Sequence, residues 1–145
     1  MEKLIPSLDA LAAEAGEFVR GLRPCTDEAT LVTLSGELGA GKTAFTKAAA
    51  RALGIDETVT SPTFVLEKIY ALPEGGAFER LIHIDAYRLE SGAELAPLGF
   101  DDLMRAPGNL ILLEWPEKVA DTLPEPYKRI LLVPMQDGSR ILTYA

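Results

Sequence analysis

Residues 36–43 read Gly36-Glu37-Leu38-Gly39-Ala40-Gly41-Lys42-Thr43 and fit the pattern G-x-x-x-x-G-K-[ST] of a phosphate-binding loop. They follow the apolar run Leu31-Val32-Thr33-Leu34 and precede a helix-forming run at residues 44–53. The glycines allow positive φ, so backbone N–H groups can turn inward, and the start of the helix adds unpaired donors and a partial positive charge. The stretch therefore predicts a strand, a loop and a helix that together bind phosphate.

Two side chains carry the chemistry of such a loop. Lys42 is expected to reach the β- and γ-phosphates of a nucleotide, and Thr43 to offer its hydroxyl to Mg²⁺. The competing interpretation is a glycine-rich turn that fits the pattern by chance, against which the flanking strand and helix argue. The residues that we predict to contact the nucleotide here are Gly36, Glu37, Leu38, Gly39, Ala40, Gly41, Lys42, Thr43 and Ala44.

Length and composition predict one compact domain over residues 1–145. The chain is 48% hydrophobic, which is enough for a substantial core. No stretch approaches the roughly 18 apolar residues of a membrane span, and the N-terminus lacks the long apolar segment of a signal peptide. We therefore expect a cytoplasmic protein without a membrane partner.

Residue counts exclude several kinds of site. With one cysteine, Cys25, and one histidine, His83, the chain cannot form an internal disulfide or a usual zinc site, so any metal should be a hard cation bound by oxygen. The net charge of −8 argues against a protein that binds a nucleic-acid backbone by itself. If RNA is involved, a partner protein should hold it.

Capping residues and apolar periodicity predict the helices. Ser7 fits the N-cap of a helix whose apolar residues recur on one face as far as Leu22. The helix after the phosphate loop, residues 42–53, should stop at Gly54. Two shorter helices are expected at residues 91–98 and 100–105, separated by a glycine.

Apolar runs predict the strands. Those at residues 64–70 and 78–84 are separated by a hairpin connection, and those at 129–133 and 140–144 predict a second antiparallel hairpin. The unbroken run at residues 109–114 is typical of a strand that is buried on both faces.

Two of these strands end in a carboxylate, at the position where an α/β sheet presents ligands. Glu114 ends an apolar run that should be buried, and burying its charge would be costly without a paired group or a cation. Asp85 could orient water or a metal, or it could only cap the following turn or pair with Arg88.

Other candidate residues have a structural interpretation beside the functional one. His83 alternates with isoleucines, which indicates a hydrogen-bonded packing residue, and the alternative is a residue that supports a site residue from behind. Tyr70 and Tyr87 suit core aromatics with polar tips. Trp115 is either another such residue or a stacking surface beside a nucleotide or partner. For Arg140 the structural interpretation is that it does no more than close the last hairpin.

Four motifs together resemble one family, the TsaE-type ATPases (also called YjeE) of bacterial tRNA threonylcarbamoyladenosine biosynthesis. They are the phosphate loop, Thr60-Ser61-Pro62-Thr63-Phe64, His83-x-Asp85-x-Tyr87-Arg88-Leu89 and Glu114-Trp115-Pro116-Glu117. The resemblance implies an α/β fold, a P-loop NTPase-like three-layer sandwich with a mixed central sheet that includes antiparallel hairpins. It also implies an ATPase that needs Mg²⁺ and supports modification of the adenosine next to the tRNA anticodon. Its partners would be TsaB and TsaD, with tRNA reached only through them.

The resemblance also implies a role for individual residues. It makes Lys42 the phosphate lysine, Thr43 and Glu114 the Mg²⁺ ligands, Thr63 a sensor of the γ-phosphate, Asp85 the acid near the attacking water, Trp115 the aromatic beside the site and Arg140 a contact to the nucleotide base. The chain departs from the usual family pattern at Ala10, Ala44 and Ile69.

Two other functions remain open from sequence. A small-molecule kinase would share the phosphate loop, but its lid usually carries arginines, and the candidate lid at residues 91–107 has only Arg105. A nucleotide-dependent binding switch would use Thr63 equally well. No arginine is evident from sequence as an internal finger, so we expect weak ATPase activity that partners increase.

Overall fold

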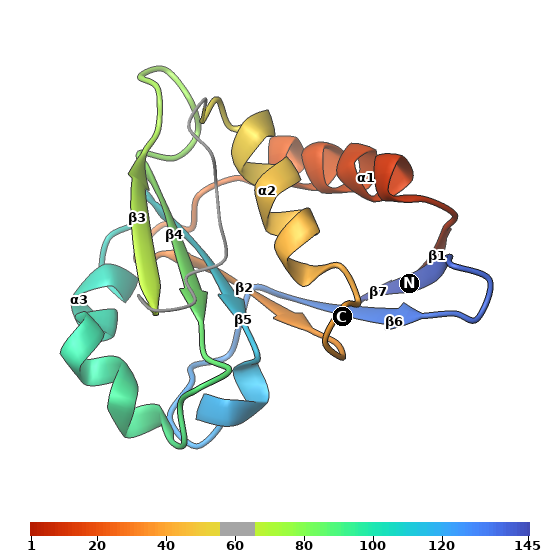
Figure 1. Cartoon of the computed structure of the whole chain (residues 1–145). Helices are drawn as coiled ribbons and strands as arrows, with labels where there is room; N and C mark the ends of the chain where they lie inside the picture. Colours follow the sequence, from red (N-terminus) through yellow and green to blue (C-terminus); the bar gives the residue numbers. More distant parts are fainter. Residues whose placement is uncertain (56–65) are drawn as a thin grey trace.

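The computed structural model describes residues 1–55 and 66–145. Its strands form one seven-stranded sheet in the order β1-β7-β6-β2-β5-β4-β3 (Figure 1). The strands are β1 (Glu2–Ile5), β2 (Thr30–Ser35), β3 (Glu67–Ala71), β4 (Arg80–Asp85), β5 (Asn109–Glu114), β6 (Lys128–Pro134) and β7 (Arg140–Tyr144). The α-helices are α1 (Leu8–Gly21), α2 (Lys42–Ala52) and α3 (Phe100–Met104), and the 3₁₀ helices are η1 (Gly92–Leu98) and η2 (Pro116–Val119).

The centre of the sheet is parallel and its margins are antiparallel. Strand β2 pairs in parallel with β5 and β6, and β5 pairs in parallel with β4. Strands β3 and β4, β6 and β7, and β1 and β7 pair antiparallel. All six residues of β5 are buried, as the unbroken apolar run predicts for a strand covered on both faces.

Helices cover both faces of the sheet, which gives three layers. In Figure 1, α1 and α2 lie side by side over one face, and the segment with η1 and α3 lies on the other. One core cluster joins Leu11 and Phe45 of these helices to Leu112, while the second joins Leu95 to Ile111. The fold is the predicted P-loop NTPase-like three-layer α/β sandwich with a mixed sheet.

The first helix begins where its capping residue predicts. The Ser7 hydroxyl accepts a hydrogen bond from the Ala10 N–H at 3.1 Å, and Leu11, Ala15 and Val19 are buried on one face. The helix thus closes the core above the phosphate loop.

The N-terminus forms a strand that the sequence prediction missed. Strand β1 is short and mostly exposed, so its sequence has no strong strand pattern. Its pairing with β7 supplies the missing backbone hydrogen bonds, and Lys3 adds an ion pair to Glu14 of α1 at 2.8 Å. Tertiary contacts, rather than local preference, therefore determine this strand.

Some predictions fall outside the described residues. The hairpin is confirmed as β3 and β4, although the predicted first strand starts at residue 64 and the description resumes at residue 66. The motif Thr60-Ser61-Pro62-Thr63-Phe64 lies outside the described part. Within that part, no helix has the length and apolar character needed to cross a membrane.

Candidate nucleotide-binding site

The loop between β2 and α2 has the backbone of a phosphate cradle. Gly36, Gly39 and Gly41 have φ of 149°, 82° and 111°. A Cβ at Gly36 would lie 2.5 Å from the Leu132 carbonyl oxygen, and one at Gly41 would lie 2.9 Å from a methyl of Leu11. The loop therefore needs glycine at both positions, for its conformation and for its close packing.

The loop lysine lies under an aromatic ring. Lys42 is 5% exposed, and its Nζ donates to the carbonyls of Gly36 at 2.5 Å and Glu37 at 2.9 Å. The same ammonium lies 4.2 Å from the centroid of the Trp115 ring. The charge of Lys42 is therefore held within the loop, at the position that the motif predicts.

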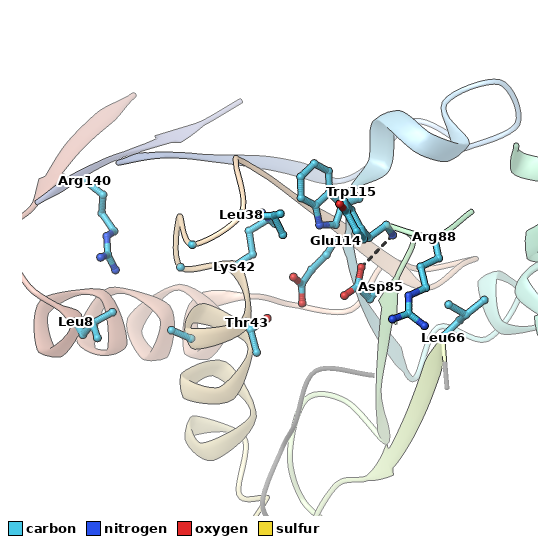
Figure 2. Close-up of a pocket in the computed structure, with 14 residues that line it drawn as sticks. Leu8, Leu38, Lys42, Thr43, Leu66, Asp85, Arg88, Glu114, Trp115 and Arg140 are labelled. Atoms are coloured by element: carbon cyan, nitrogen blue, oxygen red, sulfur yellow. Dashed lines mark hydrogen bonds between the residues drawn. The ribbon is translucent and has the colours of Figure 1, made fainter. Parts of the chain in front are cut away.

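Two carboxylates end neighbouring strands beside this lysine. Asp85 of β4 and Glu114 of β5 are Cα partners, and both line the cavity with Lys42 (Figure 2). Like charges on directly paired residues repel, so a cation between them would be favourable. Burial lowers the pKa of Lys42, and the carboxylates of Glu114, Glu117 and Asp85 oppose this shift without cancelling it.

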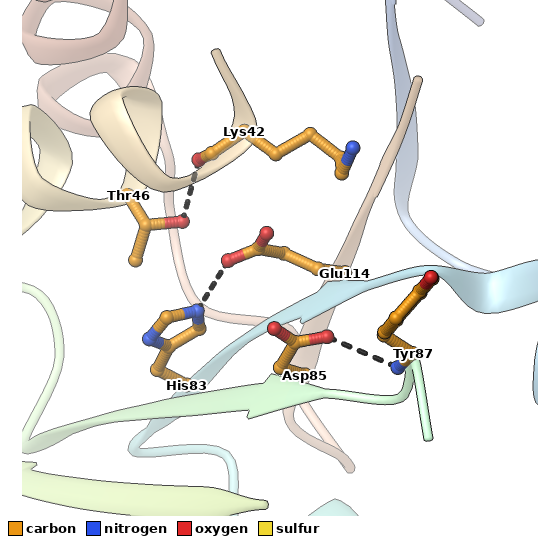
Figure 3. Close-up of polar contacts among 6 residues, drawn as sticks. All are labelled: Lys42, Thr46, His83, Asp85, Tyr87 and Glu114. Atoms are coloured by element: carbon orange, nitrogen blue, oxygen red, sulfur yellow. Dashed lines mark hydrogen bonds and ion pairs between the residues drawn. The ribbon is translucent and has the colours of Figure 1, made fainter. Parts of the chain in front are cut away.

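Glu114 has a buried partner. Its Oε2 lies 2.5 Å from Nε2 of His83, and the two side chains are 2% and 0% exposed (Figure 3). The sequence indicated a hydrogen-bonded packing histidine, and the structure identifies its partner as a site residue. Strand pairing could have suggested this contact, because His83 pairs with Leu112, two residues before Glu114 on the same face.

Asp85 caps a turn and also borders the cavity. Its Oδ1 accepts a hydrogen bond from the Tyr87 N–H at 3.0 Å, so it does cap the turn after β4. It also lines the cavity and is only partly buried, which fits the wetter setting expected for a residue that orients water.

A cavity of about 540 Å³ connects these groups, a size within the range of small-molecule sites. Figure 2 shows Leu8 and Arg140 toward one end, Lys42 and Thr43 in the middle, and Asp85 with Arg88 toward the other. The cavity therefore extends along the phosphate loop, from Arg88 and Asp85 to Arg140.

Two arginines line this cavity. Arg140 is the residue for which the resemblance implies a contact to the nucleotide base, and Arg88 belongs to one of the four motifs that carry the resemblance. Nε and Nη1 of Arg140 are buried and have no hydrogen-bond partner within the described residues, and a Cβ on Gly41 would lie 3.0 Å from Nη1. Arg140 starts β7 and still points its guanidinium at the loop.

Of the two tyrosines that were predicted to be core aromatics, one is buried and the other is exposed. Tyr70 is 4% exposed, as expected for a core aromatic, but Tyr87 is 44% exposed because it follows the end of β4 in a turn. Its ring lies 4.9 Å from that of Trp115. Among the described residues, Trp115 is the one non-glycine with a positive φ, 61°, and this turn brings its ring over Lys42.

The cavity residues suit a magnesium nucleotide. Residues 1–55 and 66–145 contain no cluster of three or more His, Cys, Asp or Glu side chains arranged to hold a metal ion. Thr43 and Glu114 both line the cavity, and oxygen atoms of a bound phosphate would complete the coordination that Mg²⁺ prefers. Of the predicted site residues, Thr63 alone lies outside the described part of the chain.

The sequence and the fold of the chain are both similar to those of known proteins. A family model described as "Threonylcarbamoyl adenosine biosynthesis protein TsaE" matches residues 7–142. The chain is 40% identical over 119 residues to the tRNA threonylcarbamoyladenosine biosynthesis protein TsaE of Treponema pallidum, covering 82% of this chain and 84% of that protein. It is 38% identical over 117 residues to the Bacillus subtilis protein of that description, covering 79% and 68%. The crystal structure of Bacillus subtilis YdiB superposes with a TM-score of 0.78 at 29% identity, covering 99% of this chain and 83% of that one.

Proposed function

Because the chain belongs to the TsaE family of threonylcarbamoyl adenosine biosynthesis proteins, we propose that it binds and hydrolyses ATP with Mg²⁺ in this cavity. The hydrolysis supports formation of the threonylcarbamoyl group on the adenosine next to the tRNA anticodon, and it takes place with TsaB and TsaD. The observation that carries the ATPase proposal is the meeting of Lys42, Asp85 and Glu114 at the phosphate loop.

Each residue has a role in this proposal. Backbone N–H groups of the loop and the Lys42 ammonium bind the β- and γ-phosphates. Thr43 and Glu114 would hold Mg²⁺, whose positive charge would neutralise the negative charge that develops on the phosphate. Asp85 orients the attacking water, and Thr63 senses the γ-phosphate. Arg140 and Trp115 contact the rest of the nucleotide.

The exposed border of the cavity supports stimulation by partners. Leu38 is 71% exposed, Tyr87 is 44% exposed, and Arg88 beside them is also exposed. A protein that covers this border would exclude water and strengthen the electrostatic interactions inside the site. We therefore expect slow hydrolysis by the isolated chain and faster hydrolysis in the complex.

The kinase alternative loses its candidate lid. Residues 91–107 contain η1 and α3, whose Leu95, Phe100 and Leu103 are buried in the core cluster on the opposite face of the sheet from α2. The segment is a structural layer of the fold, so it is not available to close over a triphosphate.

The test measures single-turnover ATP hydrolysis by the purified chain, alone and with TsaB and TsaD. Slow turnover alone and a marked increase in the complex would support the proposal. Fast turnover that the two proteins leave unchanged would contradict the partner dependence, and an absence of ATP binding under both conditions would overturn the ATPase assignment. Phosphate transfer to a small acceptor, without release of free phosphate, would favour a kinase.

A further inference from the structure

His83 and Glu114 form a buried pair beneath the cavity. They lie on adjacent parallel strands and on the face of the sheet that α2 covers, and their side chains are almost completely shielded from solvent. The carboxylate borders the cavity, whereas the ring is not among the groups that line it. The histidine therefore cannot contact a ligand directly and can act on it only through Glu114.

The hydrogen bond fixes one oxygen of this carboxylate. Figure 3 shows Oε2 of Glu114 directed at Nε2 of His83, while the other oxygen is directed away from the ring, toward the side of Lys42. The hydrogen bonds of the Lys42 ammonium are to carbonyls of its own loop. The orientation of Glu114 thus depends on the imidazole.

The surroundings of the ring also favour one tautomer. Nδ1 of His83 is buried and has no hydrogen-bond partner among the described residues. An ionised carboxylate only accepts hydrogen bonds, so the ring nitrogen that faces Glu114 must carry a proton, and in a neutral imidazole the other nitrogen then carries none. A neutral ring with its proton on Nε2 donates to Glu114 and avoids a buried N–H without a partner.

We infer that His83 is a positioning residue, which donates Nε2–H to Oε2 of Glu114 and so directs the other oxygen of that carboxylate toward the metal of a bound nucleotide. The part of this inference that concerns the metal rests on the proposed function. The hydrogen bond and the tautomer of His83 do not depend on that function. Groups that orient a metal ligand typically change metal affinity by about 10- to 100-fold when they are removed.

The first experiment needs no nucleotide. Since the chain has a single histidine, a long-range ¹H–¹⁵N spectrum of tag-free protein contains one imidazole, which needs no assignment. We expect the neutral tautomer with the proton on Nε2, and a shifted Nε2 signal in Glu114→Gln. A proton on Nδ1, or a spectrum that Glu114→Gln leaves unchanged, would overturn the inference whether or not the chain binds ATP.

The second experiment measures ATP affinity by calorimetry in excess Mg²⁺ and in EDTA. His83→Leu should reduce the affinity in Mg²⁺ by about 10- to 100-fold. Affinity in EDTA should stay unchanged, because the loop and Lys42 are intact. His83→Gln, whose amide can replace the Nε2 donor, should restore most of the loss. Thr33→Val is the matched control, since Thr33 is buried on a neighbouring strand but faces the other core cluster.

The outcomes separate this inference from the proposed function. Wild-type Mg²⁺ dependence in a folded His83→Leu would overturn the positioning role while leaving the ATPase assignment intact. An equal loss in Mg²⁺ and in EDTA would also overturn it, because it would indicate general damage to the site. If wild-type protein binds no ATP, the proposed function fails, and the spectrum of the single histidine still decides whether the hydrogen bond exists.

Discussion

The Lys42 ammonium contacts two carbonyls of the phosphate loop and the face of the Trp115 ring, so its charge is fixed beside the loop. Replacing it with alanine removes charge-assisted hydrogen bonds to phosphate, each worth about 1.5–3 kcal/mol. We expect Lys42→Ala to lower ATP affinity by at least about 100-fold in calorimetry while the fold remains intact. Lys47→Ala removes an exposed charge from the same helix and should bind normally. An affinity near that of wild type in Lys42→Ala would contradict the phosphate-loop assignment.

Substitutions of the two strand-end acids, Glu114 and Asp85, should have different effects. Glu114→Gln keeps an acceptor for His83 but loses the charge that a metal needs, so Mg²⁺-dependent ATP binding and hydrolysis should fall together. Asp85→Asn can still accept from the Tyr87 N–H, so binding should stay close to wild type while the chemical step slows by about 10²-fold or more. Titrations of ATP at varied Mg²⁺, with single-turnover hydrolysis, measure both. The reverse pattern would exchange the two roles.

At the scale of elements, Glu14 joins α1 to β1 and β7. Its Oε1 accepts from Lys3 at 2.8 Å and from the Tyr144 hydroxyl at 2.7 Å. Burial by itself would raise the pKa of Glu14, but the hydrogen bonds from Lys3 and Tyr144 outweigh it and lower the pKa below its ordinary value of 4.5. Because the folded-state pKa is the lower one, this contribution to stability is complete above about pH 4.5 and is lost as the pH falls through the folded-state pKa.

This linkage predicts a difference in acid stability. Glu14→Gln keeps an acceptor for Tyr144 but loses the ion pair to the partly exposed Lys3, so the free energy of unfolding at neutral pH should fall by roughly 0.2–1 kcal/mol. The difference from wild type should shrink below pH 4. Urea unfolding at several pH values measures it, with Glu17→Gln as a control on the same helix, since Glu17 is exposed. A difference that is constant with pH would contradict the ionic origin.

The elements differ in how well sequence predicts them. Strand β5 and the phosphate loop were predictable because their signals are local, an apolar run in one case and glycines before a lysine in the other. Strand β1 was not, since a short exposed segment forms a strand only where β7 supplies its hydrogen bonds. The contact between His83 and Glu114 likewise depends on the register of two strands, which the sequence alone leaves open.

At the scale of the whole molecule, the parallel order of the central strands explains why the phosphate loop and the two strand-end acids lie together. Strands β4, β2 and β5 end at the same edge of the sheet, so Asp85, Glu114 and the loop had to meet there. Arg140 reaches the cavity from β7, which lies beyond β6 in the sheet. The periods of 3.6 and 2 residues that identify helices and strands in a sequence do not show which distant strands lie near each other. The loop and the two strand-end acids therefore follow from local patterns in the sequence, whereas the place of Arg140 at the cavity was predicted only through the resemblance to a family.

The overall charge predicts a weak affinity of the protein for free RNA. With 22 acidic and 14 basic side chains, the molecule carries a net charge of −8 and repels a polyanion, so neutralising tRNA phosphates would require a concentrated basic surface. We expect a dissociation constant for free tRNA weaker than about 10 µM at physiological salt, measured by gel shift or fluorescence anisotropy. The same tRNA should bind when TsaB and TsaD are added. Submicromolar binding by the chain alone, weakening steeply with salt, would show that it carries its own RNA site and that its partners are not needed to hold the substrate.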